Sequence, residues 1–309
     1  MPATNPFRLR GVFVPLVTPF DKRGDLDTAA LEHLVDYLIE AGVHGLFVGG
    51  TTGEFALLST SERKRLAEVV IDRTAGRLPV VVHAGAPSTR ETIDLARHAR
   101  GAGAPAVAVV APYYFALSDV ALVAHYTDVC EAVGDFPVLL YNIPQCTVNA
   151  LGPQVAAEIV ARCPNVVGIK DSTGNLSQTI EYTTLRPDFQ VAQGADGLLV
   201  AGLSMGIQAA VSGNANVFPE LAREVFDAWW RGDQTAAREA QVRFDAARRP
   251  LRDGNNLSLF KRVLARRGVP VGDVRGPLQA ASEAEVDAAV EAIQAAGIRV
   301  AGPALTASV

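Results

Sequence analysis

The feature that most constrains the fold is an alternation of short apolar runs with stretches of helical spacing. Eight such runs are rich in β-branched residues and nearly free of charge, as strands buried on both faces of a sheet should be. They are Val12–Val17, Gly45–Val48, Val80–His83, Val107–Val110, Val138–Tyr141, Val166–Ile169, Phe189–Ala192 and Ile207–Val211. Each run is followed by a segment with helical periodicity, so the pattern predicts parallel strands joined by crossover helices.

The helical segments carry start signals that support this interpretation. Ser59 with Glu62, and Ser88 with Glu91, have the spacing of capping boxes at the beginning of two of these helices. Eight strands and eight helices in about 230 residues predict an α/β fold of the (β/α)8 or TIM-barrel type. An open, doubly wound sheet is the alternative, but it would carry a G-x-G-x-x-G turn after an early strand, where this chain has Thr18–Asp21. We therefore expect the barrel.

The sequence after the eighth expected helix has a different organisation. No convincing strand follows, and three helical stretches are separated by proline and glycine: Thr235–Ala247, Leu257–Arg267 and Glu283–Ala295. The predicted domains are a catalytic barrel at residues 1–231, a C-terminal three-helix appendage at 232–300, and a frayed tail at 301–309.

Composition excludes several classes of partner. The chain of 309 residues is 49% hydrophobic and 20% charged, and its net charge of −5 gives no reason to expect nucleic acid or an anionic membrane. It contains no apolar run of about 18 residues, the length that spans a bilayer. The residues Met1–Arg10 lack the apolar region of a secretory signal. Three cysteines without a C-x-x-C pair fit a reducing compartment, so we expect a cytoplasmic protein.

Candidate catalytic groups are sought where strands end, because the active site of a barrel lies at the carboxyl ends of its strands. Lys170 directly follows the run Val166–Ile169. Desolvation there favours the neutral amine, which can attack a ketone and form an imine. The alternative is a lysine that reaches solvent or pairs with Asp171. Tyr141 ends the neighbouring run, and its phenol is either a proton donor and acceptor or an ordinary core side chain.

A second candidate is the loop after the second run. Thr51 and Thr52 lie between Gly50 and Gly53, where two hydroxyls and exposed backbone N–H groups suit a carboxylate or phosphate. A plain tight turn is the alternative. The five histidines show no metal-ligand spacing, which favours an imine route that needs no metal or other cofactor.

Four of these strand-end motifs are far more specific together than any one alone. Gly50–Glu54, Pro112–Tyr114, Tyr141–Pro144 and Gly168–Asp171 occur in order on the second, fourth, fifth and sixth expected strands. With these four motifs in this order, the chain closely resembles the dihydrodipicolinate synthase / N-acetylneuraminate lyase family of class I pyruvate aldolases. The likeness extends over nearly the whole chain, and it implies a TIM-barrel lyase acting on pyruvate or another 2-oxo acid.

The resemblance also implies roles for single residues. Lys170 would form the imine, and Tyr141 would shuttle protons. Thr51 would connect Tyr141 to Tyr114 in a hydroxyl relay, with Tyr114 reaching in from a neighbouring subunit of a homotetramer made of two tight dimers. The remaining expected substrate-binding residues surround the bound 2-oxo acid and its second partner: Gly50, Thr51 and Thr52 at the carboxylate, Val211 beside the pyruvate, and Gly194, Asp196 and Ser212 in the rest of the pocket.

The second substrate is less well defined. In the synthase, an arginine two residues beyond Tyr-Asn-x-Pro binds the carboxylate of aspartate semialdehyde, whereas this chain has Gln145 and then Cys146. Sialic acid lyases have glutamate where this chain has Gly197. We therefore expect cleavage or dehydration of a 2-keto-3-deoxy sugar acid. The alternative is 4-hydroxy-tetrahydrodipicolinate (dihydrodipicolinate) synthase, and a third hypothesis is a catalytically idle sugar-acid-binding homologue.

Overall fold

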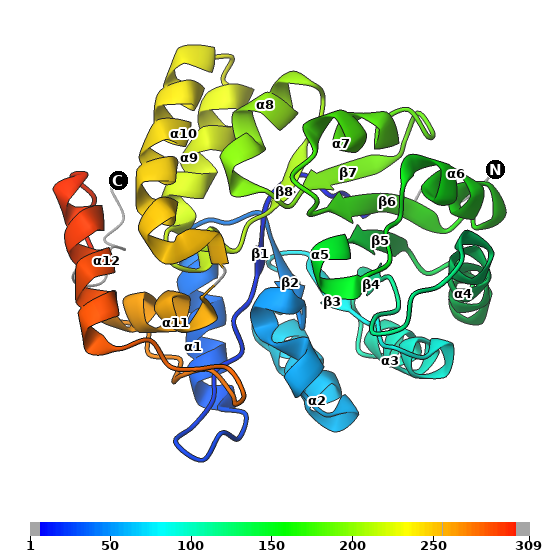
Figure 1. The fold of residues 1–309 in the computed structure, drawn as a ribbon, viewed down its shortest axis with the longest axis horizontal. Coiled ribbons are helices and arrows are strands. Elements are labelled where there is room, and N and C mark those ends of the chain that lie inside the picture. The colour runs from blue at the N-terminus through cyan, green and yellow to red at the C-terminus, as the bar shows by residue number, and fades with distance from the viewer. Residues whose placement is uncertain (1–6, 255, 301–309) are drawn as a thin grey trace. The chain divides into compact units, whose positions relative to one another are not determined.

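The eight expected strands form a closed parallel barrel in the order β1 to β8, as the barrel prediction requires. The fold is seen here in a computed structural model that describes residues 7–254 and 256–300 (Figure 1). The strands are β1 Gly11–Pro15, β2 Gly45–Val48, β3 Val80–His83, β4 Ala106–Val110, β5 Val138–Asn142, β6 Val166–Asp171, β7 Gln190–Gln193 and β8 Ala209–Val211. Nearly every strand residue is buried, which explains why these runs read as continuous apolar segments.

Helices follow the strands and continue beyond the last one. They are α1 Thr28–Glu40, α2 Thr60–Thr74, α3 Thr89–Gly101, α4 Asp119–Val133, α5 Pro144–Thr147, α6 Pro153–Arg162, α7 Leu176–Tyr182, α8 Leu199–Ser204, α9 Pro219–Trp230, α10 Gln234–Arg248, α11 Leu257–Arg266 and α12 Glu283–Ala295. The last three correspond to the three helices expected near the C-terminus. None of the helices in the described part of the chain is long and apolar enough to cross a bilayer.

Local sequence determines where these helices begin. At α2 the Ser59 hydroxyl accepts a hydrogen bond from the Glu62 backbone N–H at 3.2 Å, and the Glu62 carboxylate accepts one from the Ser59 backbone N–H at 2.8 Å. Both halves of the expected capping box are therefore present. At α3 the Ser88 hydroxyl likewise accepts from the Glu91 N–H, at 3.2 Å.

Several strand ends differ from the prediction by one or two residues, and two of these differences have a clear physical reason. Strand β6 continues two residues beyond Ile169, because Lys170 and Asp171 remain paired with the neighbouring strands. Strand β1 ends two residues before Val17. The backbone N–H of Val17 donates instead to the Asn216 side chain at 3.1 Å, which takes this residue out of the strand.

The chain divides into two compact units. Among the described residues, the first contains 7–11 and 79–211, and it holds β3 to β8 with α3 to α8. The second contains 12–78 and the described residues from 212 to 300, and it holds β2, most of β1, and the helices α1, α2 and α9 to α12. Within the second unit α9 and α10 pack side by side (Figure 1). The domain boundary expected at residue 231 stays a prediction, and the tail at 301–309 lies outside the described residues.

Candidate active site

Strands β5 and β6 bring Lys170 and Tyr141 together. The two residues are direct partners in the parallel ladder, so their side chains leave the sheet on the same face. The Lys170 Nζ lies 3.9 Å from the centroid of the Tyr141 ring. Lys170 is 5% exposed and Tyr141 is 1% exposed. A lysine nitrogen is therefore held over a phenol in a nearly water-free environment, where both groups can exchange protons with one bound molecule.

The next pair in the same ladder, Asn142 and Asp171, faces the other side of the sheet. The Asp171 carboxylate is fully buried, and it accepts hydrogen bonds from Asn142 Nδ2 at 2.9 Å, Thr173 Oγ1 at 2.7 Å and Thr179 Oγ1 at 2.6 Å. The Asn142 side chain also accepts from the Leu151 N–H at 2.9 Å. These hydrogen bonds hold the carboxyl ends of β5 and β6 in register, and that register aligns Tyr141 with Lys170.

His83 is an additional residue at this site. It is the last residue of β3 and is buried, and its ring meets the Tyr141 ring edge-on with 5.8 Å between centroids. Gly85 leaves room for the His83 ring, because a Cβ there would lie 2.9 Å from the His83 Nε2 and 2.7 Å from the Val110 backbone nitrogen. From the sequence the histidines were considered only as metal ligands, so His83 was not among the expected site residues. Its position at the end of an apolar run was the available signal.

Three expected substrate-binding residues lie at or just beyond the ends of β7 and β8. Gly194 follows β7, and its backbone N–H donates to the Asp171 carbonyl at 2.7 Å. A Cβ on Gly194 would lie 2.2 Å from the Ser172 Oγ, so only glycine fits this approach of β7 to β6. Val211 ends β8 and is buried. Asp196 opens a short 3-10 helix, η3 (Asp196–Leu198), and is also buried.

Tyr114 differs from these buried residues in its exposure. Its side chain is 83% exposed, and its backbone has the left-handed φ of 81°. The segment is nevertheless firmly held, because the buried Asn149 side chain donates to the carbonyls of Pro112 at 2.7 Å and Phe115 at 2.8 Å. Asn149 also accepts from the Leu117 N–H at 2.8 Å. Tyr114 and its neighbour Phe115, which is 70% exposed, thus present two aromatic rings on a braced loop, with 5.1 Å between their centroids.

In the second unit, the expected carboxylate-binding loop is a tight turn with half-buried hydroxyls. Thr51–Gly53 forms a 3-10 helix, η1, directly after β2, and Gly50 precedes it in an extended conformation. Thr51 and Thr52 are half-buried. The loop is tied to its surroundings by Thr18, whose hydroxyl donates to the Gly53 carbonyl at 2.6 Å. The two interpretations offered by the sequence, a tight turn and an anion-binding loop, are therefore compatible.

Ser212, which the sequence places in the pocket, is fully buried. Its hydroxyl accepts from the Ala215 N–H at 3.3 Å, and its backbone N–H donates to the Phe13 carbonyl at 2.9 Å. Next to it, a Cβ built on Gly213 would lie 3.6 Å from the Thr52 hydroxyl. Ser212 thus supports the turn after β8. The hydroxyl relay from Thr51 through Tyr141 to Tyr114 stays a prediction.

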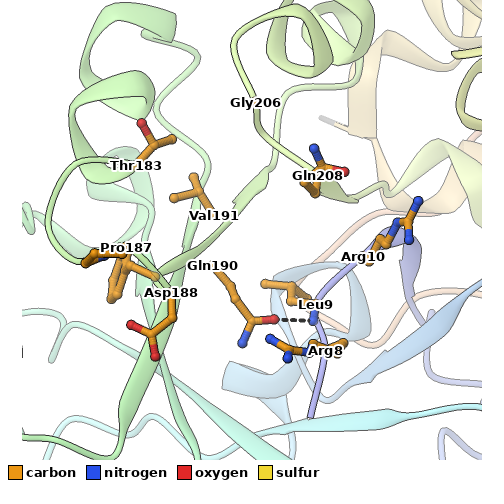
Figure 2. A pocket seen from close by; sticks show the side chains of 11 residues that line it. Arg8, Leu9, Arg10, Thr183, Pro187, Asp188, Gln190, Val191, Gly206 and Gln208 are labelled. Carbon is orange, nitrogen blue, oxygen red and sulfur yellow. Dashed lines mark hydrogen bonds between the residues drawn. The ribbon is translucent and has the colours of Figure 1, made fainter. Parts of the chain in front are cut away.

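A cavity lies at the opposite ends of the strands, on the far side of the barrel from Lys170. This hollow has a volume of about 470 Å³. Figure 2 shows Arg8 and Arg10 on one side of it and Asp188 on another. Gln190, the first residue of β7, accepts a hydrogen bond from the Leu9 N–H at 2.6 Å there. The cavity therefore lies at the amino ends of the strands, away from Lys170. Within the described residues, no group of three or more histidine, cysteine, aspartate or glutamate side chains is arranged to hold a metal.

Comparison with known proteins gives one consistent result. The model of the dihydrodipicolinate synthetase family matches residues 8–296. An uncharacterized DapA-like lyase of Halobacterium salinarum is 38% identical over 275 residues, which cover 89% of this chain and 90% of the relative. A 4-hydroxy-tetrahydrodipicolinate synthase of Hyphomonas neptunium is 40% identical over 286 residues, covering 91% of this chain and 97% of the relative.

Solved structures agree with the relatives. The dihydrodipicolinate synthase of Aquifex aeolicus matches with a TM-score of 0.88 at 29% identity, covering 94% of this chain and 98% of the other. YagE, a prophage protein of the dihydrodipicolinic acid synthase family from E. coli K12 solved in complex with pyruvate, matches with a TM-score of 0.90 at 30% identity. That match covers 94% of this chain and 99% of the other.

Proposed function

The chain belongs to the dihydrodipicolinate synthetase family, and on this premise we propose that Lys170 forms the Schiff base of a class I pyruvate lyase. The observation that carries the proposal is the placement of the Lys170 Nζ 3.9 Å from the centre of the Tyr141 ring, with both residues buried. A nucleophile beside a proton-transfer group, both shielded from water, is the arrangement that imine formation needs. The chain is thus a lyase of the Schiff-base type, with Lys170 as its proposed nucleophile.

The proposed reaction runs in balanced steps. The neutral amine of Lys170 attacks C2 of pyruvate, and the carbonyl oxygen takes up a proton to give a carbinolamine. Loss of that oxygen as water leaves a protonated imine, for which Tyr141 supplies and removes protons. The imine accepts the electron pair released when C3 loses a proton, and the resulting enamine attacks an aldehyde. Cleavage of a C3–C4 bond is the same sequence in reverse, so one lysine supports both directions.

The remaining roles are proposed on the family resemblance together with the local geometry. Thr51 and Thr52 would bind the pyruvate carboxylate through their hydroxyls and the backbone of Gly50. Their half-buried position on a tied 3-10 turn supports this, because a rigid donor set loses little entropy on binding. Val211, Gly194 and Asp196 would line the rest of the pocket.

The second substrate has two candidates. The names of the relatives favour 4-hydroxy-tetrahydrodipicolinate synthase, which condenses pyruvate with aspartate semialdehyde, over the sugar-acid lyase that was expected first from the sequence. We accordingly place the synthase reaction first. The observation that keeps a 2-keto-3-deoxy sugar acid as the second candidate is Cys146, whose thiol pKa is raised by partial desolvation and lowered to a lesser degree by the Lys170 charge. A neutral thiol offers a carboxylate no positive charge.

Covalent trapping tests the proposal about Lys170. Incubating the protein with pyruvate and borohydride should add one reduced pyruvyl group, located at Lys170 by peptide mass analysis, and Lys170→Ala should lose both the adduct and turnover. An unmodified Lys170 in active enzyme would refute the proposal. Parallel assays with aspartate semialdehyde and with 2-keto-3-deoxy acids then decide between the two second substrates. Pyruvate binding without turnover on either would point to the idle homologue.

We also propose a homotetramer of two tight dimers and a cytoplasmic location. Large side chains at one region of the first unit are strongly exposed in a single chain, Tyr114 at 83%, Val120 at 80% and Val148 at 66%. Burying such a patch against a second copy would stabilise a dimer and bring Tyr114 to the neighbouring site. Sedimentation velocity tests the assembly, and Val120→Asp should shift the population toward smaller species. The free cysteines, Cys130, Cys146 and Cys163, fit a reducing compartment.

A further inference from the structure

The second unit contains a fully buried ion pair between the β2 loop and a C-terminal helix. The Lys261 Nζ on α11 lies 2.6 Å from Glu54 Oε1, and neither side chain is exposed to solvent. The same ammonium donates to the Asp273 carbonyl at 2.8 Å and lies 4.3 Å from the centre of the Phe20 ring. Burial lowers the pKa of Lys261, and the charge of Glu54 opposes this effect. A buried pair with these additional partners has one fixed geometry.

Glu54 is part of the loop that contains Thr51 and Thr52. Its backbone N–H donates to the Thr51 carbonyl at 3.0 Å and closes the 3-10 turn, and its carbonyl accepts from the Leu57 N–H at 2.8 Å. Glu54 has the left-handed φ of 57°, which is unfavourable for a residue with a Cβ. Such a conformation persists only when the surroundings hold it. The carboxylate does so at two points, through Lys261 and through the backbone N–H of Arg275, which donates at 2.9 Å.

Arg275 binds the other end of the same loop, at Leu57. Its guanidinium donates to the Leu57 carbonyl at 2.9 Å and to the Gly24 carbonyl at 2.6 Å. It also forms a two-oxygen pair with Glu62 at 2.6 Å and 3.1 Å. Residues 54–57 are thus held from one side by α11 and the segment around residue 275.

A gain in folding stability does not by itself explain why Glu54 and Lys261 form a buried ion pair. Taking two charges out of water is so unfavourable that well-packed apolar residues of similar volume often serve as well or better. What the pair supplies is a fixed position for the loop backbone. From this geometry we infer that Glu54 and Lys261 are positioning residues, which hold the Thr51–Thr52 turn in the shape that binds the substrate carboxylate. The inference rests on the proposed function of those threonines, and it gives the C-terminal helix α11 a part in the reaction.

Two measurements on Lys261→Met test this inference. The first is amide hydrogen exchange in the segment 51–57, which needs no substrate. Losing the pair should speed exchange there by about tenfold or more, because the turn opens locally. The second is the pyruvate concentration that half-saturates borohydride trapping. It should rise about tenfold while the maximal trapping rate stays within about twofold, since an interaction equal in ground and transition states affects only half-saturation.

Arg266→Met is the matched control. Arg266 lies on the same helix α11, is half-exposed, and pairs with Glu283 at 2.9 Å and Asp287 at 3.0 Å on α12. Removing this charge should leave both exchange in 51–57 and pyruvate half-saturation unchanged. Because Lys261→Met leaves the Glu54 charge buried without its ammonium, the double variant Glu54→Gln/Lys261→Met serves as a folded backup, and it should show the same two effects.

The outcomes separate the two proposals. If the wild-type protein forms no pyruvate adduct, the proposed function fails, while exchange in 51–57 still decides whether the pair fixes the loop. If the adduct forms, and a folded variant lacking the pair keeps wild-type exchange in 51–57 and wild-type half-saturation, the positioning role is refuted. A lower melting temperature with both readouts unchanged also refutes it, because the pair would then be purely structural.

Discussion

Replacing Asn142 by alanine tests how the outward side of the barrel supports the chemistry on its inner side. Asn142 is fully buried, and its side chain donates to the Asp171 carboxylate at 2.9 Å and to the Tyr182 hydroxyl at 3.3 Å, while it accepts from the Leu151 N–H at 2.9 Å. Alanine would leave a buried carboxylate with one donor fewer and a buried N–H without an acceptor. The first loss costs about 1.5–3 kcal/mol and the second about 1–3 kcal/mol.

Together these terms predict a destabilisation of roughly 2.5–6 kcal/mol. In a chain of this size each kcal/mol lowers the melting temperature by about 2 °C, so a fall of roughly 5–12 °C is expected. Differential scanning calorimetry measures it. Below the transition, the rate of pyruvate trapping at Lys170 should fall about 10- to 100-fold, because misplacing a reacting group by about 1 Å has effects of that size.

Asn165→Ala is the control for this prediction. Asn165 donates to the carbonyls of Cys130 and Phe136, both at 3.2 Å, so its loss affects only neutral backbone acceptors. It should lower the melting temperature by less than half as much, and it should leave trapping at Lys170 unchanged. If Asn142→Ala is no more damaging than Asn165→Ala, or if it melts early but traps pyruvate at the wild-type rate, then Asn142 does not set the register of Lys170.

Three further substitutions address single contacts. Tyr141→Phe keeps the ring beside Lys170 but removes the hydroxyl. Turnover in a steady-state assay should therefore fall about 10²- to 10⁴-fold while the protein remains folded. Wild-type turnover in this variant would exclude the phenol from proton transfer. Gly194→Ala would place a Cβ 2.2 Å from the Ser172 Oγ, so it should lower both the melting temperature and activity, whereas alanine at the open Gly152 should affect neither. Burial lowers the pKa of His125 to about 4, so the unfolded chain binds this proton first. Its contribution to stability is present above about pH 6.5 and is lost as pH falls toward 4, and His125→Gln should flatten melting temperature against pH across that window.

The barrel was predictable from the sequence because its strands are buried on both faces. Four-residue runs such as Gly45–Val48 and Val80–His83 coincide with β2 and β3, since a fully buried parallel strand must be apolar along its whole length. The end of β6 was less accurate, because Lys170 and Asp171 look like loop residues in isolation. Only their pairing with β5 and β7 makes them part of a strand.

Sequence spacing could single out Lys170 and Tyr141 as candidates, but it could not identify the residues that support them. Lys170 and Tyr141 follow recognisable apolar runs, but nothing local in the sequence relates Glu54 to Lys261, which packing brings to 2.6 Å. His83 was overlooked for a different reason. Its closeness to Tyr141 depends on β3 and β5 facing one interior, and sequence spacing does not encode that contact.

Side chains along β5 and β6 alternate between the two faces of the sheet. The proposed reacting residues and the residues that support them therefore occupy neighbouring positions on opposite faces. Tyr141 and Lys170 share one face, while Asn142 and Asp171, one residue further along each strand, share the other. A polar pair buried on the outward face adds no reacting group, yet its hydrogen bonds to a buried carboxylate fix the register on which the inward pair depends. Tyr141→Phe should therefore remove turnover with little loss of stability, and Asn142→Ala should reduce both. If the two variants instead showed the same ratio of lost activity to lost stability, the division of roles between the two faces would have to be abandoned.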